Sequence, residues 1–237
     1  ELEKRASASL LSAANTSIEE QAWLNAAQSY HAQNKTIAIV IPNLHEQYSR
    51  ITRLISQHFH TDDVNISGGL PLSNYPVVAH AMTLIELALY DTLSPAMQSI
   101  VLKSPFIEGA QQEYAVRMSY ADRALHQSRT RNDFANMLLD DCPILAQKIL
   151  ELSVDTETTN PIEWVNRFLA ILEQMGFPGP YSPQSTAYQC LGRFKLCLES
   201  FKSLHLLTPT LNASAAYAQL HTICQHTIFQ PQANPNA

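Results

Sequence analysis

Glycine followed by lysine is the pair that would bind a nucleotide phosphate, because the backbone amides of a P-loop surround the phosphates and its lysine neutralises them. The chain has six glycines, and none of them is followed by lysine. The sequence therefore predicts that this segment binds no nucleotide through a P-loop.

Carboxylates would have to stand near lysine in a nuclease of the restriction type, where they hold the divalent ion and the lysine helps to orient the attacking water. No lysine of the chain has Asp or Glu two positions before it. The stretch HEQYS at 45–49 begins like the zinc-protease motif HExxH, but Ser49 stands in place of the second histidine. Asp141 precedes Cys142 and a proline and is better explained as a helix cap. We therefore expect no metal, no cofactor and no catalytic centre in this segment.

Contact with DNA phosphates is the chemistry that remains, since arginine side chains and backbone amides suit it. The densest basic stretch supplies four candidate contacts: Arg117, Arg123, Arg129 and Arg131. A glycine turn, whose amides could meet a DNA strand, supplies four more: Asn65, Ser67, Gly68 and Gly69. Arg50 and Arg53 are further basic groups upstream. The alternatives are a solvated helix face for the arginines and an ordinary tight turn for the glycines.

Charge and composition limit these functions. The net charge is -6, and non-specific DNA binding depends on basic residues that displace counterions, so the segment as a whole is not a strong nucleic-acid binder. No apolar run approaches the about 20 residues that a membrane helix needs. The chain starts with charged residues and without Met. We expect a piece of a longer cytoplasmic protein, with no signal peptide and no membrane partner.

The four cysteines show no metal-binding pattern, because no two of them have CxxC spacing. Cys190 and Cys197 would be about 10 Å apart along one helix, which is too far for a disulfide. We expect four buried free thiols in a reducing cytoplasm.

The residue pattern in the first third of the chain predicts alternating helices and strands. A helix is expected at 17–33, and the β-branched run at 35–42 is typical of a strand buried on both faces of a parallel sheet. Asn43 is expected to cap a helix with helically spaced apolar residues, and a short extended piece follows at 64–67. Two short strands do not make an independent sheet, so we expect the other strands to come from elsewhere in a parent protein.

After about residue 91 the pattern is helical throughout. Proline and capping residues mark the expected helix starts at Ser94, Asp141, Asn160, Ser182 and Asn212. Helices are expected near 95–103, 111–127, 131–139, 143–152, 160–175, 183–205 and 213–227. The fold class is thus α/β plus mostly α, a small partial parallel-sheet unit followed by a large helical subdomain. The domains expected are 1–91, 92–228 and a linker or tail at 229–237.

Four motifs in order carry a resemblance to a known family. They are IAIVIPN at 37–43, NISGGLPL at 65–72, LKSPFIEGA at 102–110 and IFQP at 228–231. Together they resemble the second RecA-like domain of UvrD-type superfamily 1 helicases with its helical insertion. The variant is closer to AddB-type helicase/nuclease subunits and related probable DNA repair proteins.

The resemblance implies a larger parent with an N-terminal helicase-like domain and a C-terminal PD-(D/E)xK nuclease domain. ATP and Mg²⁺ would be bound there, and a partner helicase/nuclease subunit is expected. Residues 1–91 would be part of a RecA-like domain and 92–228 its insertion, a non-catalytic segment that helps to form a DNA-binding channel. The alternative, favoured by the acidic charge and the helical second half, is a protein-interaction scaffold without a nucleic-acid role.

Overall fold

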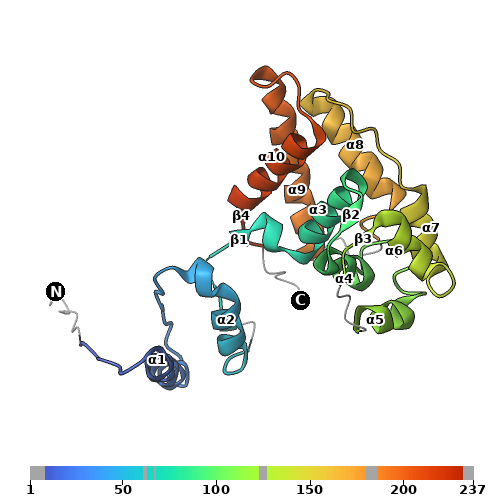
Figure 1. The fold of residues 1–237 in the computed structure, drawn as a ribbon. Coiled ribbons are helices and arrows are strands. Elements are labelled where there is room, and N and C mark those ends of the chain that lie inside the picture. Colours follow the sequence, from blue (N-terminus) through green and yellow to red (C-terminus); the bar gives the residue numbers. More distant parts are fainter. Residues whose placement is uncertain (1–8, 61–62, 67, 123–126, 180–185, 232–237) are drawn as a thin grey trace. The chain divides into compact units, whose positions relative to one another are not determined.

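The computed structural model describes residues 9–60, 63–66, 68–122, 127–179 and 186–231. The chain divides into two compact units, Glu1–Gly68 and Gly69–Ala237, which we call unit 1 and unit 2. Within the described residues both units are built mostly from helices (Figure 1). The division lies between Gly68 and Gly69, whereas the sequence pattern placed the domain boundary at residue 91. The difference arises because the apolar helix after Tyr75 packs with the later helices.

Unit 1 contains helices α1 (Thr16–His31) and α2 (Leu44–Ser56), joined by an extended stretch. The side chain of Asn15 caps α1 by accepting a hydrogen bond from the amide of Ile18 at 3.0 Å. Asn43 precedes α2 as expected, but it has a left-handed φ of 54° and its side chain makes no capping bond. Both expected helices are confirmed, whereas the expected cap at Asn43 is wrong.

The expected buried strand at 35–42 does not form. The described residues of unit 1 include no strand, and Ile37, Ile39 and Val40 are 36%, 40% and 90% exposed. The β-branched residues do favour an extended backbone, but a strand needs a neighbour, and no described segment supplies one. The expected extended piece at 64–67 likewise forms no strand over Val64–Ile66, and Ser67 lies outside the described residues.

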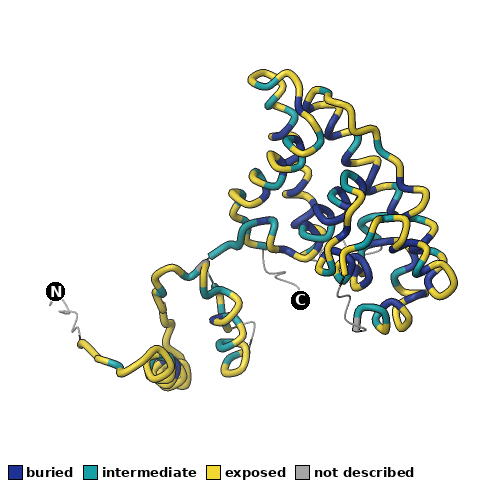
Figure 2. The backbone as a smooth tube through the Cα atoms, in the orientation of Figure 1, coloured by how far each residue is buried: buried dark blue, intermediate teal, exposed yellow. Residues whose placement is uncertain are grey.

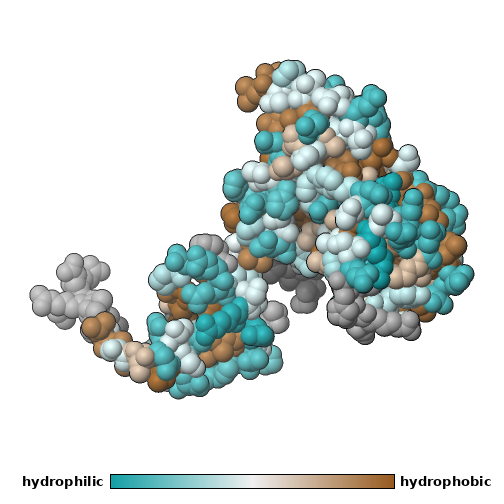
Figure 3. Space-filling view, viewed as in Figure 1, coloured by the Kyte–Doolittle hydropathy of each residue, from teal (hydrophilic) through white to brown (hydrophobic). Residues whose placement is uncertain are grey.

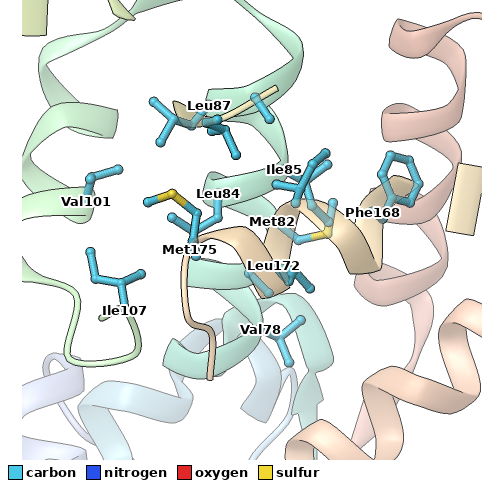
Figure 4. Packing of buried hydrophobic residues seen from close by; sticks show 14 of the residues in the cluster. Val78, Met82, Leu84, Ile85, Leu87, Val101, Ile107, Phe168, Leu172 and Met175 are labelled. Carbon is cyan, nitrogen blue, oxygen red and sulfur yellow. The ribbon is translucent and has the colours of Figure 1, made fainter. Parts of the chain in front are cut away.

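Helix α3 (Pro76–Leu89) is the centre of unit 2. Most of its residues are buried, although His80 and Glu86 remain partly exposed, and Figure 2 shows that buried residues concentrate in this unit. Figure 4 shows Val78, Met82 and Ile85 of α3 among side chains from later helices, including Phe168 and Leu172. Helices α4, α8, α9 and α10 all contact α3.

The helices around α3 begin and end close to the expected positions. They are α4 (Pro95–Lys103), α5 (Tyr114–Asp122), α6 (Arg131–Leu138), α7 (Pro143–Glu151), α8 (Pro161–Gln174), α9 (Thr186–Lys202) and α10 (Ala213–His226). The expected starts at Ser94, Asn160 and Asn212 are confirmed, since each side chain accepts a hydrogen bond from the amide three residues later. Cys142 rather than Asp141 precedes α7, and Ser182 lies outside the described residues. The 3-10 turns η2 (Leu72–Asn74) and η3 (Ser203–Leu206) belong to the described part of unit 2.

Two short antiparallel strand pairs close unit 2. Strand β1 (Leu70–Pro71) pairs with β4 (Ile228–Phe229), and β2 (Thr92–Leu93) pairs with β3 (Arg129–Thr130). The described strands thus form no parallel sheet, and that part of the expected fold class is not found, whereas the mostly helical character is. Among the described helices, none is both long and apolar enough to cross a membrane.

Gly69→Ala tests the pairing that closes unit 2. A Cβ at Gly69 would lie 2.6 Å from the carbonyl oxygen of Phe229, so one backbone segment has to move. We expect a loss of about 1–3 kcal/mol in the free energy of unfolding, as for overpacking elsewhere. The measurement is urea unfolding of the whole chain.

Gly192→Ala is the matched control. Gly192 lies inside α9, and nothing is within 4 Å of the Cβ that it lacks. Alanine there should raise the free energy of unfolding by about 0.5–1 kcal/mol, because glycine weakens a helix interior. Equal effects of the two substitutions would contradict the close approach of Gly69 to β4.

Candidate functional site

Arg117, the first of the predicted phosphate contacts, is inside unit 2. Its side chain is 1% exposed in α5. The Nε and Nη2 atoms donate to Oε2 of Glu113 at 3.0 and 2.7 Å, and Nη2 also donates to the carbonyl of Glu108 at 2.9 Å. This burial removes Arg117 from the predicted DNA contacts. The spacing of four residues between Glu113 and Arg117 is the sequence signal for such an internal ion pair.

Glu113 extends this ion pair to a second helix. Its Oε1 atom accepts a hydrogen bond from the amide of Ile144 at 2.6 Å, and Oε2 accepts one from the amide of Leu145 at 3.2 Å. Both amides belong to the first turn of α7, where a carboxylate is favoured by the helix dipole. One buried carboxylate therefore neutralises Arg117 and caps α7, so the group is structural.

Arg129 and Arg131 lie together at β3 and the start of α6, and both are half-buried. The Nη1 atom of Arg129 donates to Oε1 of Gln98 at 2.9 Å, and Nη1 of Arg131 donates to the carbonyl of Ala88 at 3.2 Å. Each arginine thus holds the β2–β3 region against α3 and α4 while part of its side chain is exposed. Arg123 lies outside the described residues.

The predicted glycine turn is divided between the two units. Asn65 is exposed in unit 1, and the amide of Gly68 donates to the carbonyl of Ile66 at 2.9 Å. Neither Gly68 nor Gly69 has a positive φ, and each would place a Cβ too close to a neighbour, Leu44 or Phe229. Close packing against the backbone of β4 therefore explains Gly69, whereas Gly68 meets only the flexible end of the Leu44 side chain. The geometry supports the alternative of an ordinary turn.

Unit 1 has a cavity that the sequence pattern did not reveal. The cavity has a volume of about 450 Å³ and its apolar wall includes Ile37, Ile39 and Ile41 of the extended stretch, together with Ile51 and Phe59. Figure 3 shows apolar surface on the face of unit 1 that is in view. The alternate isoleucines were the signal for this one-sided contact, but a continuous apolar run suggested burial on both faces.

His31 and Asp63 are two of the polar residues at this cavity. Both residues line it, and the Nε2 atom of His31 is 3.6 Å from a carboxylate oxygen of Asp63. Their side chains are 49% and 41% exposed, so solvent screens the pair strongly. The cavity wall is therefore mixed, because Lys35 and Asn65 also line it beside the apolar side chains.

The four cysteines are buried free thiols, as expected. The hydrogen bond with Cys197, together with burial, raises the pKa of Cys224, and burial raises the pKa of Cys190 to about 11. Cys197 also lies 3.5 Å from the hydroxyl of Thr227. No group of three metal-binding side chains occurs in the described part of the chain.

Comparison of the chain with protein-family models, curated proteins and solved structures gave no match. A function must therefore be argued from the molecule itself. Its candidate features are the half-buried Arg129 and Arg131 in unit 2, and the exposed extended stretch with its cavity in unit 1.

Glu113→Gln tests the structural role of the buried ion pair. The amide would leave the Arg117 cation without its counter-charge and turn a donor toward α7, so we expect a loss of about 3–5 kcal/mol in the free energy of unfolding. Replacing Arg117 as well, with Met, should restore part of the loss. Urea unfolding of the single and double variants measures both effects.

Glu108→Gln is the matched control. The Glu108 side chain is 55% exposed and pairs with Lys148 at 2.6 Å, so its neutralisation should change stability by about 0–1 kcal/mol. Similar losses for Glu113→Gln and Glu108→Gln would contradict the assigned role.

Proposed function

We propose that the chain is a non-catalytic segment of a larger helicase/exonuclease-like DNA repair protein, where it helps to form a DNA-binding channel. The observation that supports the proposal is that the first and last described strands of unit 2, β1 and β4, pair with each other. Leu70 is opposite Phe229 and Pro71 is opposite Ile228 in the β1–β4 pair. A helical body whose two ends meet is suited to insertion within another domain, because the host chain leaves and re-enters at the same point.

Side-chain bonds reinforce this closure. The hydroxyl of Tyr75 donates to the carbonyl of Phe229 at 2.7 Å, and the amide of Leu72 donates to the carbonyl of Thr227 at 2.8 Å. The two rings of Tyr75 and Phe229 also pack edge to face, with centroids 6.0 Å apart. These contacts fix the entry and exit of unit 2, as an insertion requires.

The structure of unit 1 also supports the proposal. It has helices and an extended apolar stretch but no sheet among its described residues. In the proposed parent, this stretch is one strand of the parallel sheet of a RecA-like domain, and the neighbouring strands come from other parts of the protein. This arrangement would account for apolar side chains that are exposed in the segment alone.

The chemistry of the parent lies elsewhere in this proposal. ATP and Mg²⁺ bind to the helicase-like and nuclease domains, a second helicase/nuclease subunit is the expected partner, and the protein works in the cytoplasm. This segment contributes basic side chains along the path of the DNA. Arg53 of α2 is exposed and has no ion-pair partner among the described residues, whereas Arg50 pairs with Glu20 at 2.7 Å.

The second candidate function is a helical protein-interaction scaffold without a nucleic-acid role. It is favoured by the internal use of Arg117 and by the hydrogen bonds that hold Arg129 and Arg131, since these reduce the basic surface of an already acidic chain. Under this proposal the chain binds a protein and has no measurable affinity for DNA.

A salt titration of DNA binding separates the two functions. The chain is titrated into fluorescently labelled single-stranded and duplex DNA, and the affinity is measured by anisotropy at several salt concentrations. We expect weak binding with a shallow dependence on salt, and Arg53→Gln or Arg131→Gln should lower the slope by about 0.7–0.9 for each DNA phosphate that the variant no longer neutralises. Unfolding measured in parallel shows whether Arg131→Gln changes only the binding.

Lys202→Gln is the control for charge alone. Lys202 ends α9 and already pairs with Glu199 at 2.7 Å, so its neutralisation should leave the slope unchanged. Absence of salt-dependent binding to either DNA, at any salt concentration, would exclude the DNA role of this segment and favour the scaffold.

A further inference from the structure

Cys197 and Cys224 lie against each other between two packed helices of unit 2. Cys197 belongs to α9 and Cys224 to the last turn of α10, and both thiols are buried. A hydrogen bond joins the two side chains. The sulfur of Cys197 is also 3.5 Å from the hydroxyl of Thr227, which follows Cys224 by about one helical turn. Two contacts therefore place Cys197 against this end of α10.

Thiols in this arrangement need little movement to become a disulfide. A disulfide requires sulfur atoms about 2 Å apart and Cβ atoms about 3.5–4.5 Å apart. Helices that already hold two thiols in contact meet most of this requirement, and rotation of the side chains supplies the remainder.

The surroundings of Cys197 favour its thiolate, which is the nucleophilic form of cysteine. The hydrogen bond from Cys224 lowers the pKa of Cys197 although burial opposes this effect, and the positive charge of Arg193 acts in the same direction as the hydrogen bond. Burial raises the pKa of Cys142, and it raises the pKa of Cys190 to about 11, so these two thiols stay protonated. Cys197 is thus the attacking thiol, and Cys224 is its partner.

The burial of the pair selects the oxidant. Cys197 is 3% exposed and Cys224 is 0% exposed, so a bulky disulfide such as oxidised glutathione is hindered from reaching Cys197 in the folded chain. Hydrogen peroxide is far smaller and meets less hindrance. We infer that Cys197 and Cys224 form a reversible disulfide when the chain meets a hydroperoxide, and that this bond fastens α9 to the end of α10.

The reaction balances with one molecule of hydrogen peroxide. The Cys197 thiolate attacks a peroxide oxygen, the O–O bond breaks, and a sulfenic acid forms as hydroxide leaves and takes a proton from the buffer. This step also removes the hydrogen bond to the Cys197 thiolate, which raises the pKa of Cys224. The sulfur of Cys224 then attacks the sulfenic sulfur, the S–O bond breaks, and the hydroxyl group leaves as water with the Cys224 proton. The two thiols lose two electrons, and the peroxide gains them.

The disulfide acts on the closure of unit 2. Thr227 caps α10, its carbonyl accepts the amide of Leu72 at 2.8 Å, and β4 follows directly. A bond at Cys224 fastens this end of α10 to α9 and restricts the unfolded chain. The oxidised chain should therefore be harder to unfold. This inference is independent of the proposed DNA role, because neither cysteine is among the basic residues assigned to DNA.

Peptide mapping of the whole chain tests the bond. The folded chain is treated with hydrogen peroxide, its remaining thiols are alkylated, and it is digested without a reductant. Mass spectrometry should find the peptides of Cys197 and Cys224 joined, and dithiothreitol should separate them. Oxidised glutathione should form the same bond at least about tenfold more slowly, because access to the attacking thiol limits exchange.

Cys197→Ser and Cys190→Ser are matched variants, since each replaces a buried thiol of α9 by a hydroxyl. Cys197→Ser should abolish the bond, and Cys190→Ser should retain it. Peroxide should raise the urea midpoint of the original chain and of Cys190→Ser, and slow hydrogen exchange of the Leu72 amide at least about tenfold in both. Neither change should occur in Cys197→Ser. Mapping of the original chain reports the bond even where a serine variant does not fold.

Three results of the mapping would overturn the inference. They are conversion of Cys197 to a sulfinic acid without a bond to Cys224, equal yields of bonds that involve Cys142 or Cys190, and a bond that forms only after the chain is unfolded in urea. A cross-linked chain with an unchanged urea midpoint would overturn the effect on the closure.

Discussion

The burial of α3 is the constraint on which unit 2 depends. Its residues Val78, Ala81, Ile85 and Leu87 are completely buried, whereas Ala79 and Glu86 remain partly exposed. Each leucine or isoleucine side chain buried in this way contributes about 1.5–3 kcal/mol, but only while other helices enclose it. α4, α8, α9 and α10 are therefore positioned by the need to cover α3.

The Glu113 carboxylate joins buried polar groups of unit 2, as α3 joins its apolar side chains. It collects the Arg117 guanidinium and two amides of α7 at a single buried point, so α5 and α7 are held at a fixed register. Such a group is directional, unlike apolar packing, and its removal leaves a buried cation unpaired. The predicted DNA-binding arginines therefore also join helices of unit 2 to one another, as Arg117 does through Glu113.

Interactions within one helical turn allowed most helices to be predicted from the sequence. The predictions that failed depend on contacts between residues distant in the sequence. The helix starts at Ser94 and Asn160 are predictable from the sequence, because a cap is an interaction within one turn. The strand expected at 35–42 needs partners that are distant in sequence, and no propensity supplies them. The burial of Arg117 could be anticipated only from Glu113 four residues before it, whereas the approach of β4 to Gly69 joins residues that are far apart in the chain.

The meeting of Leu70 and Phe229 makes unit 2 a portable module. Joining two chain ends that already lie side by side takes little conformational entropy, since the closing loop is short. A body of this kind can be transplanted into a surface turn of an unrelated host, or deleted and replaced by a short hairpin, without stretching the host backbone.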